Sequence, residues 1–401
     1  MADQSPRPLD GVRVLDLSNL MAAPMAAMYL GDFGADVIKA EHPERGDELR
    51  NWGRKRDGVG LFFKVVNRNK KMVTLNLSTQ GGQDLARRLA SQADVVIENY
   101  RPGTMARWGL GWEQLSTINP GLVMAQVTGY GQTGPYSGRP GFGTLAEAFS
   151  GCAAITGFAD RPPLLPAFGL GDATTAIHAA FAITAALYHR DASGGRGQVV
   201  DLALYEGLFT LLGPHVVDYD QLGVVQERHG SRIPHVAPRN TFHTADGHWV
   251  AIAGATQRTF ERICAVLGIE DVLDDERFAD NQARAANAET LDERIQEAIG
   301  KLPLDEVLTR FAEAEAPVGP AYDVAGIFAD DHYAARENIV RVDDAELGPI
   351  RMQNAVPRLS ATPGRIDHAG QPLGAHNAEV YEGLLGLGSE DLARLRDEGA
   401  I

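Results

Sequence analysis

Apolar and polar positions in the first forty residues follow a strand–helix–strand pattern. Residues 12–17 alternate and begin with β-branched side chains, which is typical of a strand. Pro24 fits the first turn of a helix over 25–33, and Gly34 lies just past its end. Residues 35–39 predict the next strand. Because a helix joins the two strands, we expect them to be parallel.

The same alternation continues along the first half of the chain. It predicts strands at 73–77, 95–98 and 123–128 and a helix over 82–93. Alternating strands and helices indicate an α/β fold with an open sheet. The glycine- and proline-rich segment 129–143 reads as a loop after a strand end, where open α/β sheets bind ligands.

The second half of the chain has a different pattern. An alanine-rich helix is expected over 173–189, with Ile177, Phe181, Thr184 and Tyr188 on one face. Residues 239–253 alternate around an Asp-Gly turn and predict a β-hairpin. Helical patterns follow at 259–267 and 292–299, and a last one near 389–396. These elements indicate a smaller α+β domain at 225–330.

Composition narrows the class of protein. The 401 residues are 44% hydrophobic and 22% charged, as in soluble globular proteins, and the net charge is −16. This charge argues against nucleic acid or an anionic membrane as a partner of the whole chain. The segment 1–10 shows no signal peptide, and the longest apolar stretch, 173–188, is short for a membrane span.

Cysteine and histidine usage argues against metal and disulfide chemistry. Cys152 and Cys264 lie outside any Cys-x-x-Cys pair, so a disulfide scaffold is excluded and a zinc site is not expected. The 11 histidines include no His-Glu-x-x-His spacing. We therefore predict no bound metal. A cytoplasmic location fits the reduced cysteines.

Nucleotide-binding glycine motifs are missing where they would be needed. The turn after the first strand, 18–23, has no glycine, and no P-loop sequence occurs. Residues 141–146 fit G-x-G-x-x-A by letter but lie in the long loop, far from the first strand. Nicotinamide, flavin and P-loop chemistry are therefore disfavoured.

Positive charge gathers in one segment. Residues 1–110 hold 16 basic and 13 acidic side chains, and the stretch 50–71 alone holds eight basic side chains and one acid, Asp57. One interpretation is a solvated face or a set of salt bridges to the acidic remainder. The other is an anion site for a phosphate-bearing ligand, which needs several converging donors.

A carboxylate stands at the predicted start of the alanine-rich helix, in the sequence Gly169-Leu170-Gly171-Asp172. Asp172 fits a simple helix N-cap, with glycines that only shape the turn. It also fits a covalent nucleophile. The positive end of the helix dipole would keep it ionised, and the glycines would leave room for a ligand.

The basic segment and Asp172 occur within a larger set of sequence motifs. The sequence resembles the class III CoA-transferase family (CaiB/BaiF type), which includes formyl-CoA and carnitine CoA-transferases and 2-methylacyl-CoA racemases. The matching stretches are Val14–Ser18, Leu30–Glu41, Asn67–Lys71, Val95–Gly103, Gly129–Tyr136, Gly171-Asp172 and Pro317–Pro320. The resemblance implies a large Rossmann-like CoA-binding domain from 1–224 and 331–401, with 225–330 as the inserted small domain. It also implies an interlocked homodimer.

The resemblance implies an activity and a set of site residues. Asp172 falls at the nucleophile position of an acyl-CoA:carboxylate CoA-transferase, which moves CoA between carboxylic acids through an aspartyl-CoA thioester. Coenzyme A or acyl-CoA is then a co-substrate and a small carboxylic acid the partner. The positions expected to contact CoA are His42, Lys70, Lys71, Asn99, Tyr100, Arg107 and Tyr130.

Departures from the family pattern bear on the substrate. Formyl-CoA transferase-like members carry a glutamine and a glutamate where this chain has Met21 and Gly143, which disfavours formyl or oxalyl groups and suggests a larger or less polar acid. The racemases carry a His-Asp pair where this chain has Phe142-Gly143, so racemase-like proton transfer is a disfavoured alternative. A CoA-binding protein without catalysis, with Asp172 only as a cap, is the third hypothesis.

Overall fold

The structure is a computed structural model that describes residues 6–401, so the first five residues of the segment examined for a signal peptide lie outside it. The chain divides into two compact units. One unit holds the chain up to Cys152 together with Leu165–Gln221 and Arg336–Ile401, and the other holds Ala153–Leu164 and Leu222–Ala335. The sequence-based boundaries at 224 and 331 stay a prediction about domains.

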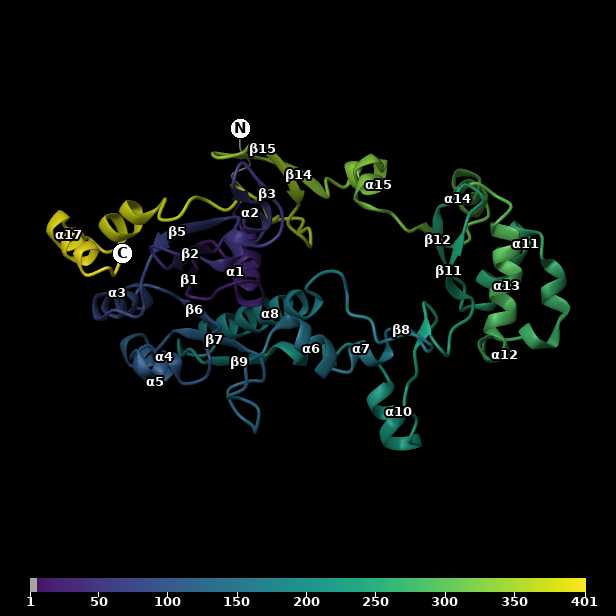
Figure 1. The fold of residues 1–401 in the computed structure, drawn as a ribbon, viewed down its shortest axis with the longest axis horizontal. Coiled ribbons are helices and arrows are strands. Elements are labelled where there is room, and N and C mark those ends of the chain that lie inside the picture. The colour runs from purple at the N-terminus through teal and green to yellow at the C-terminus, as the bar shows by residue number, and fades with distance from the viewer. Residues whose placement is uncertain (1–5) are drawn as a thin grey trace. The chain divides into compact units, whose positions relative to one another are not determined.

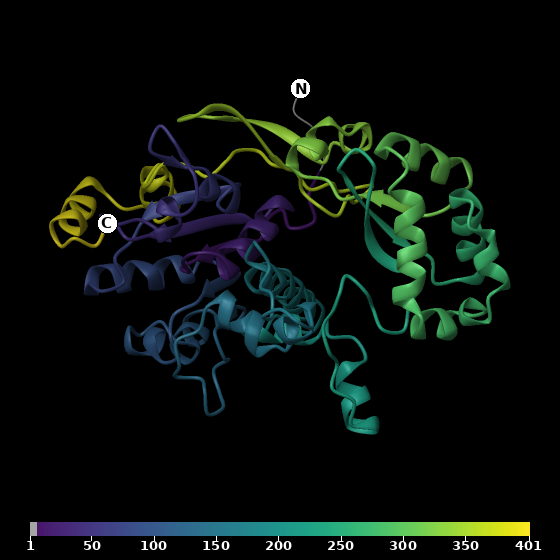
Figure 2. The ribbon, with the colours of Figure 1, turned by 45° about the vertical axis from the view of Figure 1, so that its right-hand side comes forward.

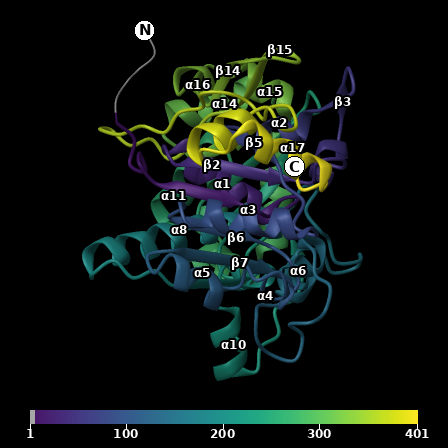
Figure 3. The same ribbon diagram turned by 90° about the vertical axis from the view of Figure 1, so that its left-hand side faces the viewer.

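A six-stranded sheet in strand order β5-β2-β1-β6-β7-β9 forms the centre of the first unit (Figures 1 and 3). All five pairings between neighbours are parallel. The strands are β1 Arg13–Asp16, β2 Asp36–Glu41, β5 Lys70–Thr74, β6 Val95–Glu98, β7 Val123–Thr128 and β9 Val199–Ala203. The predicted parallel α/β sheet is confirmed. The order reverses between β1 and β6, so the carboxyl ends of these two strands mark the switch point.

Both faces of the sheet are buried, because neighbouring residues of each strand enter different cores. Val14 packs with α1 and α8 in one core, while Leu15 packs with α3 and the C-terminal segment in the other. This two-sided burial explains the nearly continuous apolar runs of the strands. The helices of this unit are α1 Ala22–Asp32, α2 Leu61–Val66, α3 Gln80–Ala90, α4 Thr104–Arg107, α5 Trp112–Ile118, α6 Gly143–Phe149, α8 Leu170–Ala192, α9 Leu204–Phe209, α10 His215–Leu222 and α17 Ser389–Asp397.

The C-terminal segment completes the first unit. After the hairpin of β14 Ile339–Asp344 and β15 Gly348–Gln353, a π-helix spans Ala378–Leu384. The fully buried Tyr381 of this π-helix donates a hydrogen bond from its hydroxyl to the carbonyl of Thr74 on β5. A short hairpin, β3 Lys55–Arg56 and β4 Val59–Gly60, precedes α2.

The second unit has its own core between a small antiparallel sheet and four helices (Figure 2). The predicted hairpin is confirmed as β11 Arg239–His243 and β12 Trp249–Ala253, to which β13 Val318–Pro320 adds. The packed helices are α11 Gln257–Leu267, α12 Asn281–Ala286, α13 Ala288–Ile299 and α14 Leu304–Glu313. The remaining α-helices and strands of the described residues are α7 Cys152–Ile155, β8 Gly157–Phe158, β10 His229–Gly230, α15 Val324–Ala329 and α16 Asp331–Ala335, and 3₁₀ helices span Glu48–Asn51, Glu270–Asp274 and Glu276–Phe278.

Candidate active site

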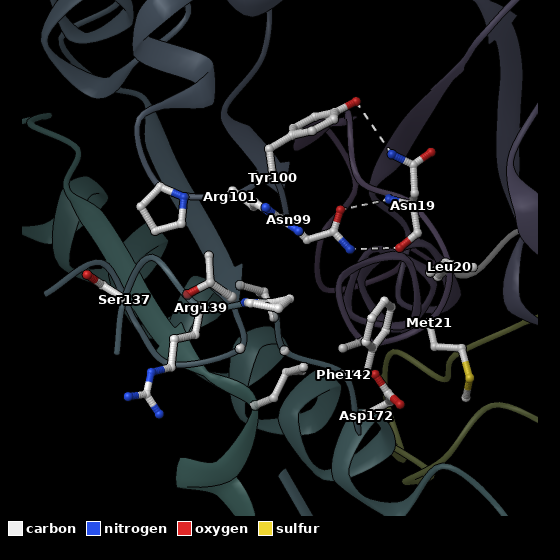
Figure 4. Close-up of a pocket in the computed structure, with 18 residues that line it drawn as sticks. Asn19, Leu20, Met21, Asn99, Tyr100, Arg101, Ser137, Arg139, Phe142 and Asp172 are labelled. Atoms are coloured by element: carbon white, nitrogen blue, oxygen red, sulfur yellow. Dashed lines mark hydrogen bonds between the residues drawn. The ribbon is translucent and has the colours of Figure 1, made fainter. Parts of the chain in front are cut away.

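Two asparagines join the strand ends at the switch point. Asn19 follows β1 and Asn99 follows β6. The backbone N–H of Asn19 donates to Oδ1 of Asn99 (2.9 Å), and Nδ2 of Asn99 donates back to the carbonyl of Asn19 (2.7 Å) (Figure 4). This reciprocal pair fixes two loops against each other at the place where doubly wound sheets bind ligands.

A cavity of about 260 Å³ opens between these loops and the start of α8. Its lining comes from the loops after β1, β6 and β7, from the glycine-rich segment and from α8. Asp172 lies at one end with Met21 and Phe142 beside it (Figure 4). Loops that follow strands far apart in the sequence thus line one cavity together with the Asp172 carboxylate.

Asp172 lies inside the first turn of α8, whose N-cap is Gly169. The interpretation of Asp172 as the N-cap is therefore wrong. Its carboxylate accepts a hydrogen bond from the backbone N–H of Ala22, the first residue of α1. It therefore faces the positive end of a second helix.

Two glycines make room for this carboxylate. A Cβ at Gly143 would collide with Oδ2 of Asp172. A Cβ at Gly169 would lie 2.8 Å from Cε of Met21 and 3.2 Å from Oδ2 of Asp172. The positions that depart from the formyl-CoA transferase pattern, Met21 and Gly143, therefore both border Asp172.

Burial changes the acidity of Asp172. Desolvation raises the pKa of Asp172 to about 6, and the nearby Glu147 carboxylate adds to the rise, against the hydrogen bond from Ala22. From the sequence, the positive end of the helix dipole is expected to keep the carboxyl group ionised. At neutral pH most of it is ionised, but helix ends do not outweigh burial here.

A second cavity of about 390 Å³ adjoins the first. The two cavities share Asn19, Leu20, Tyr100 and Phe142 in their linings. The second one extends to His42, Arg45 and Asn76. Together they form a path from a polar, partly basic end to the Asp172 carboxylate.

The structure brings some of the predicted CoA-contacting residues together at this path. Asn99 and Tyr100 line the first cavity, and His42 and Tyr100 line the second. Arg107 is exposed on α4 and donates to Oγ1 of Thr104, and Tyr130 packs edge-on against Tyr136 and Phe149. Neither Arg107 nor Tyr130 is among the described residues that line the two cavities.

Lys70 lies in the interior of the first unit. It is fully buried and its Nζ donates to Asp16 (3.0 Å), to Asn67 (3.0 Å) and to the carbonyl of Pro24 (2.7 Å). Burial lowers the pKa of Lys70 to about 8, with Lys39 contributing, against the attraction of Asp16. These three bonds occupy the three donors of the ammonium group.

Most of the other basic side chains in the segment 50–71 are also paired with acids. Lys71 contacts Asp36 (2.7 Å) and Glu379 (3.0 Å). The other pairs are Arg50 with Glu41, Arg56 with Asp57, Lys64 with Asp344 and Glu346, and Arg68 with Asp32. Of the two interpretations of the segment 50–71, the salt bridges describe these side chains. The anion-site interpretation stays a prediction for Arg54 and Lys55, which are exposed and have no acidic partner within the described chain.

Two acids next to the path were missed from the sequence. Asp47 is fully buried, pairs with Lys39 (3.0 Å) and accepts the backbone N–H of Leu20. Glu147 on α6 is buried and accepts the backbone N–H of Gly171 (3.1 Å). For Glu147 the available signal was a charged residue within an otherwise apolar segment, which does not name the partner. Asp47 lies in a highly charged segment and gave no such signal.

Two further observations bear on partners. Among residues 6–401, no group of three or more His, Cys, Asp or Glu side chains could hold a metal ion. In the described part of the chain one helix, α8, is long and apolar enough to cross a membrane, but core helices of globular proteins have the same length and composition. Its inner face packs against α1 in the core beside the sheet.

Comparisons with known proteins identify the family. The model of CoA-transferase family III matches residues 9–377. A succinyl-CoA–D-citramalate CoA-transferase of Chloroflexus aurantiacus is 44% identical over the full length of both chains. A succinate–glutarate CoA-transferase of Agrobacterium fabrum is 36% identical, over 94% of this chain and 96% of that protein.

Solved structures agree with this assignment. A CaiB/BaiF family protein from Brucella suis superposes with a TM-score of 0.83 at 34% identity, covering 95% of this chain and 100% of that one. The chain therefore belongs to CoA-transferase family III, and the resemblance inferred from its motifs is confirmed. It is an enzyme, a CoA-transferase, whose co-substrates are CoA thioesters.

Proposed function

We propose that the protein moves CoA from an acyl-CoA donor to a carboxylic acid through an aspartyl-CoA thioester on Asp172. The observation that carries the proposal is the position of this carboxylate. It ends a path lined by loops of the switch point and has Gly143 and Gly169 where larger side chains would block it. A buried carboxylate with a raised pKa is also a better nucleophile than an ordinary one.

The bonds exchange in four steps. An Asp172 oxygen attacks the donor carbonyl carbon, the C–S bond breaks, and CoA leaves as thiolate with the electron pair. The thiolate attacks the aspartyl carbonyl of the anhydride, which releases the donor acid as carboxylate and leaves the aspartyl-CoA thioester. The acceptor carboxylate attacks this thioester, giving a second anhydride and thiolate. The thiolate then attacks the acyl carbonyl, which yields the new acyl-CoA and frees Asp172.

Helix ends support the charged intermediates of these steps. The N–H of Ala22, at the start of α1, already donates to Asp172. An oxyanion that develops beside Asp172 would meet the same helix terminus, which stabilises negative charge. On this proposal Asn99 and Tyr100 contact the acyl-CoA near its thioester, and His42 and Arg45 contact it further out.

Four further residues are proposed to contribute to CoA binding in different ways. Arg107 lies on α4, and Tyr130 directly follows Gly129, which lines the first cavity. Lys71 is one-third exposed, and its positive charge would attract the phosphates of CoA. Lys70 is enclosed by its own partners, so its part in CoA binding would be to hold neighbouring backbone.

A dicarboxylic acid or its CoA thioester is the proposed substrate class. Relatives at 40–44% identity are named as succinyl-CoA transferases acting on D-citramalate or L-malate. Arg101 and Arg139 line the cavity of Asp172 and are exposed, which suits a second carboxylate. Met21 and Phe142 provide an apolar wall for the carbon chain. The larger acid expected from the sequence fits this class.

We further propose that the enzyme acts as a homodimer in the cytoplasm. α8 presents Ile177, Phe181 and Tyr188 with exposed fractions of 56%, 73% and 77%. Apolar patches of this kind commonly mark protein interfaces. Neither nucleic acid nor membrane is proposed as a partner.

Trapping of the covalent enzyme tests the proposal. Incubation with succinyl-CoA and then hydroxylamine should convert Asp172 to a hydroxamate, which peptide mass spectrometry detects. D172N should lose CoA transfer by about 10³-fold or more and form no adduct. An active D172A enzyme would falsify the proposal. Deuterium wash-in beside the thioester without CoA exchange would favour the racemase alternative, for which Phe142 and Gly143 supply no proton carrier.

A further inference from the structure

Glu147 lies against the first turn of α8, the turn that carries Asp172. It belongs to α6, one helical turn after Gly143, so both residues are on one face of that helix. Gly143 leaves space for Oδ2 of Asp172, and a Cβ at Gly171 would touch Cγ of Glu147 at 3.5 Å. On one face of α6, Gly143 therefore lies against Asp172 and the Glu147 side chain lies against Gly171.

The carboxylate of Glu147 is held in place. Its side chain is 3% exposed, and Oε1 accepts the backbone N–H of Gly171 at 3.1 Å. Glu147 has no ion pair with a basic side chain within the described chain. A buried carboxylate without a counter-ion is costly, so its retention next to another carboxylate calls for a reason.

We propose that Glu147 is a positioning residue for Asp172, which fixes the Gly171-Asp172 peptide from behind and places a second negative charge beside the nucleophile. This inference rests on the proposed covalent role of Asp172. Glu147 does not contact the substrate path, because it is not among the residues that line the cavity. Its effect must therefore pass through Asp172.

The negative charge of Glu147 affects the free and the acylated states of Asp172 differently. Asp172 is negative before attack and neutral once its oxygen forms the new C–O bond, since the C–S bond breaks and the charge leaves on the thiolate. Repulsion from Glu147 therefore raises the free energy of the free carboxylate and not that of the acylated residue. The raised pKa of Asp172, to which Glu147 contributes after burial, agrees with this repulsion.

The variant E147Q separates charge from contact. The amide oxygen can still accept the N–H of Gly171, but the charge is lost. We expect the acid limb of the pH profile of kcat/KM to move down by about one pH unit and kcat on the plateau to fall about tenfold. The fraction of enzyme that carries the CoA adduct should fall, while KM for succinyl-CoA changes less than twofold.

E206Q is the matched control. Glu206 also accepts one backbone N–H, that of Ala203 at 2.7 Å, at the start of a helix, but it does not interact with Asp172. E206Q should keep the wild-type pH profile and adduct fraction. E147D keeps the charge and should keep the acid limb even if kcat falls, so it preserves the test if E147Q folds poorly.

The possible results separate failure of the role of Glu147 from failure of the proposed function. An E147Q enzyme with the wild-type acid limb and adduct fraction overturns the role of Glu147, and so does an E147D enzyme whose limb moves as far as predicted for E147Q. If wild-type enzyme forms no adduct on Asp172, the proposed function itself fails, whatever Glu147 does. A moved limb and a reduced adduct in E147Q alone support the inference.

Discussion

Asp47 holds Leu20 in a left-handed backbone conformation. Leu20 has φ +67°, and its N–H donates to both carboxylate oxygens of Asp47, at 3.1 and 3.3 Å. A left-handed leucine costs about 1–3 kcal/mol and persists only where its surroundings determine it. Because Leu20 lines both cavities, the buried pair of Asp47 and Lys39 shapes the floor of the acyl-CoA path.

D47N should therefore damage both stability and substrate binding. Removal of the charge leaves the buried Lys39 without its nearest acidic partner, which costs about 3 kcal/mol or more of unfolding free energy. KM for succinyl-CoA should rise as the loop relaxes. Asp57 provides the comparison, because its side chain is 83% exposed and, among residues 6–401, pairs only with the neighbouring Arg56. Equal urea midpoints for D47N and D57N would contradict this account.

G143A should disable the reaction by moving the nucleophile. The added Cβ has no room unless Asp172 gives way, and a displacement near 1 Å costs about 10² in rate. KM for succinyl-CoA should change little, because the rest of the path is intact. G138A provides the comparison in the same loop, where a Cβ would meet no atom within 4 Å. Steady-state kinetics of both variants test the point, and an active G143A enzyme would refute it.

The sequence predicted five of the six strands of the parallel sheet but missed β9, and it predicted the surroundings of Asp172 poorly. β6 and β7 begin and end where the apolar runs do. β5 begins three residues earlier than expected, at Lys70, because a buried lysine does not look like a strand residue until Asp16 is known to face it. Periodicity reports which face is buried, but it cannot report partners from distant segments.

The same limit applies to the nucleophile. Asp172 was found from its neighbouring glycines and from family resemblance. Its environment comes from Ala22, Gly143 and Glu147, which belong to two other helices. No local pattern joins these segments, so neither the raised pKa nor the need for glycine at position 143 could be predicted.

D172N should make the folded enzyme more stable at neutral pH while it abolishes activity. The pKa of Asp172 is about 6 in the folded chain and near 3.8 when unfolded, so the folded state binds this proton more tightly. Ionisation therefore destabilises the fold above pH 6, and the penalty disappears as the pH falls toward 4. The shift corresponds to a gain on the order of 2–3 kcal/mol for D172N.

Urea denaturation of the wild-type enzyme and of D172N at pH 7.5 and pH 5 measures this difference in unfolding free energy. The stability gain of D172N should fall by about half at the lower pH. In wild-type enzyme, kcat/KM should decline below about pH 6 as the nucleophile becomes protonated. A gain that does not depend on pH would mean that the carboxyl of Asp172 titrates normally.

Neighbouring lysines should differ sharply in their effect on stability. Lys70 is fully buried with three partners, so K70M leaves Asp16 with a weakened counter-charge and costs about 3–5 kcal/mol. Lys71 is one-third exposed, and K71M should cost about 1 kcal/mol or less. Denaturation curves compare the two. The structure thus changes the meaning of a CoA-binding defect at position 70, which would follow from unfolding rather than from a lost contact.

The exposed face of α8 should carry the subunit interface. Ile177 and Phe181 line an apolar groove of about 650 Å³ in the first unit, together with Tyr29 and Val356. A monomer would leave this groove and these side chains in water, at a cost of about 25 cal/mol per Å² of apolar surface. F181E should therefore convert a dimer into a monomer in light scattering coupled to size exclusion. I118E alters a single exposed apolar residue on α5 and should leave the mass unchanged. A wild-type enzyme that is monomeric at micromolar concentration, or an F181E enzyme that stays dimeric, would show that this face is not the interface.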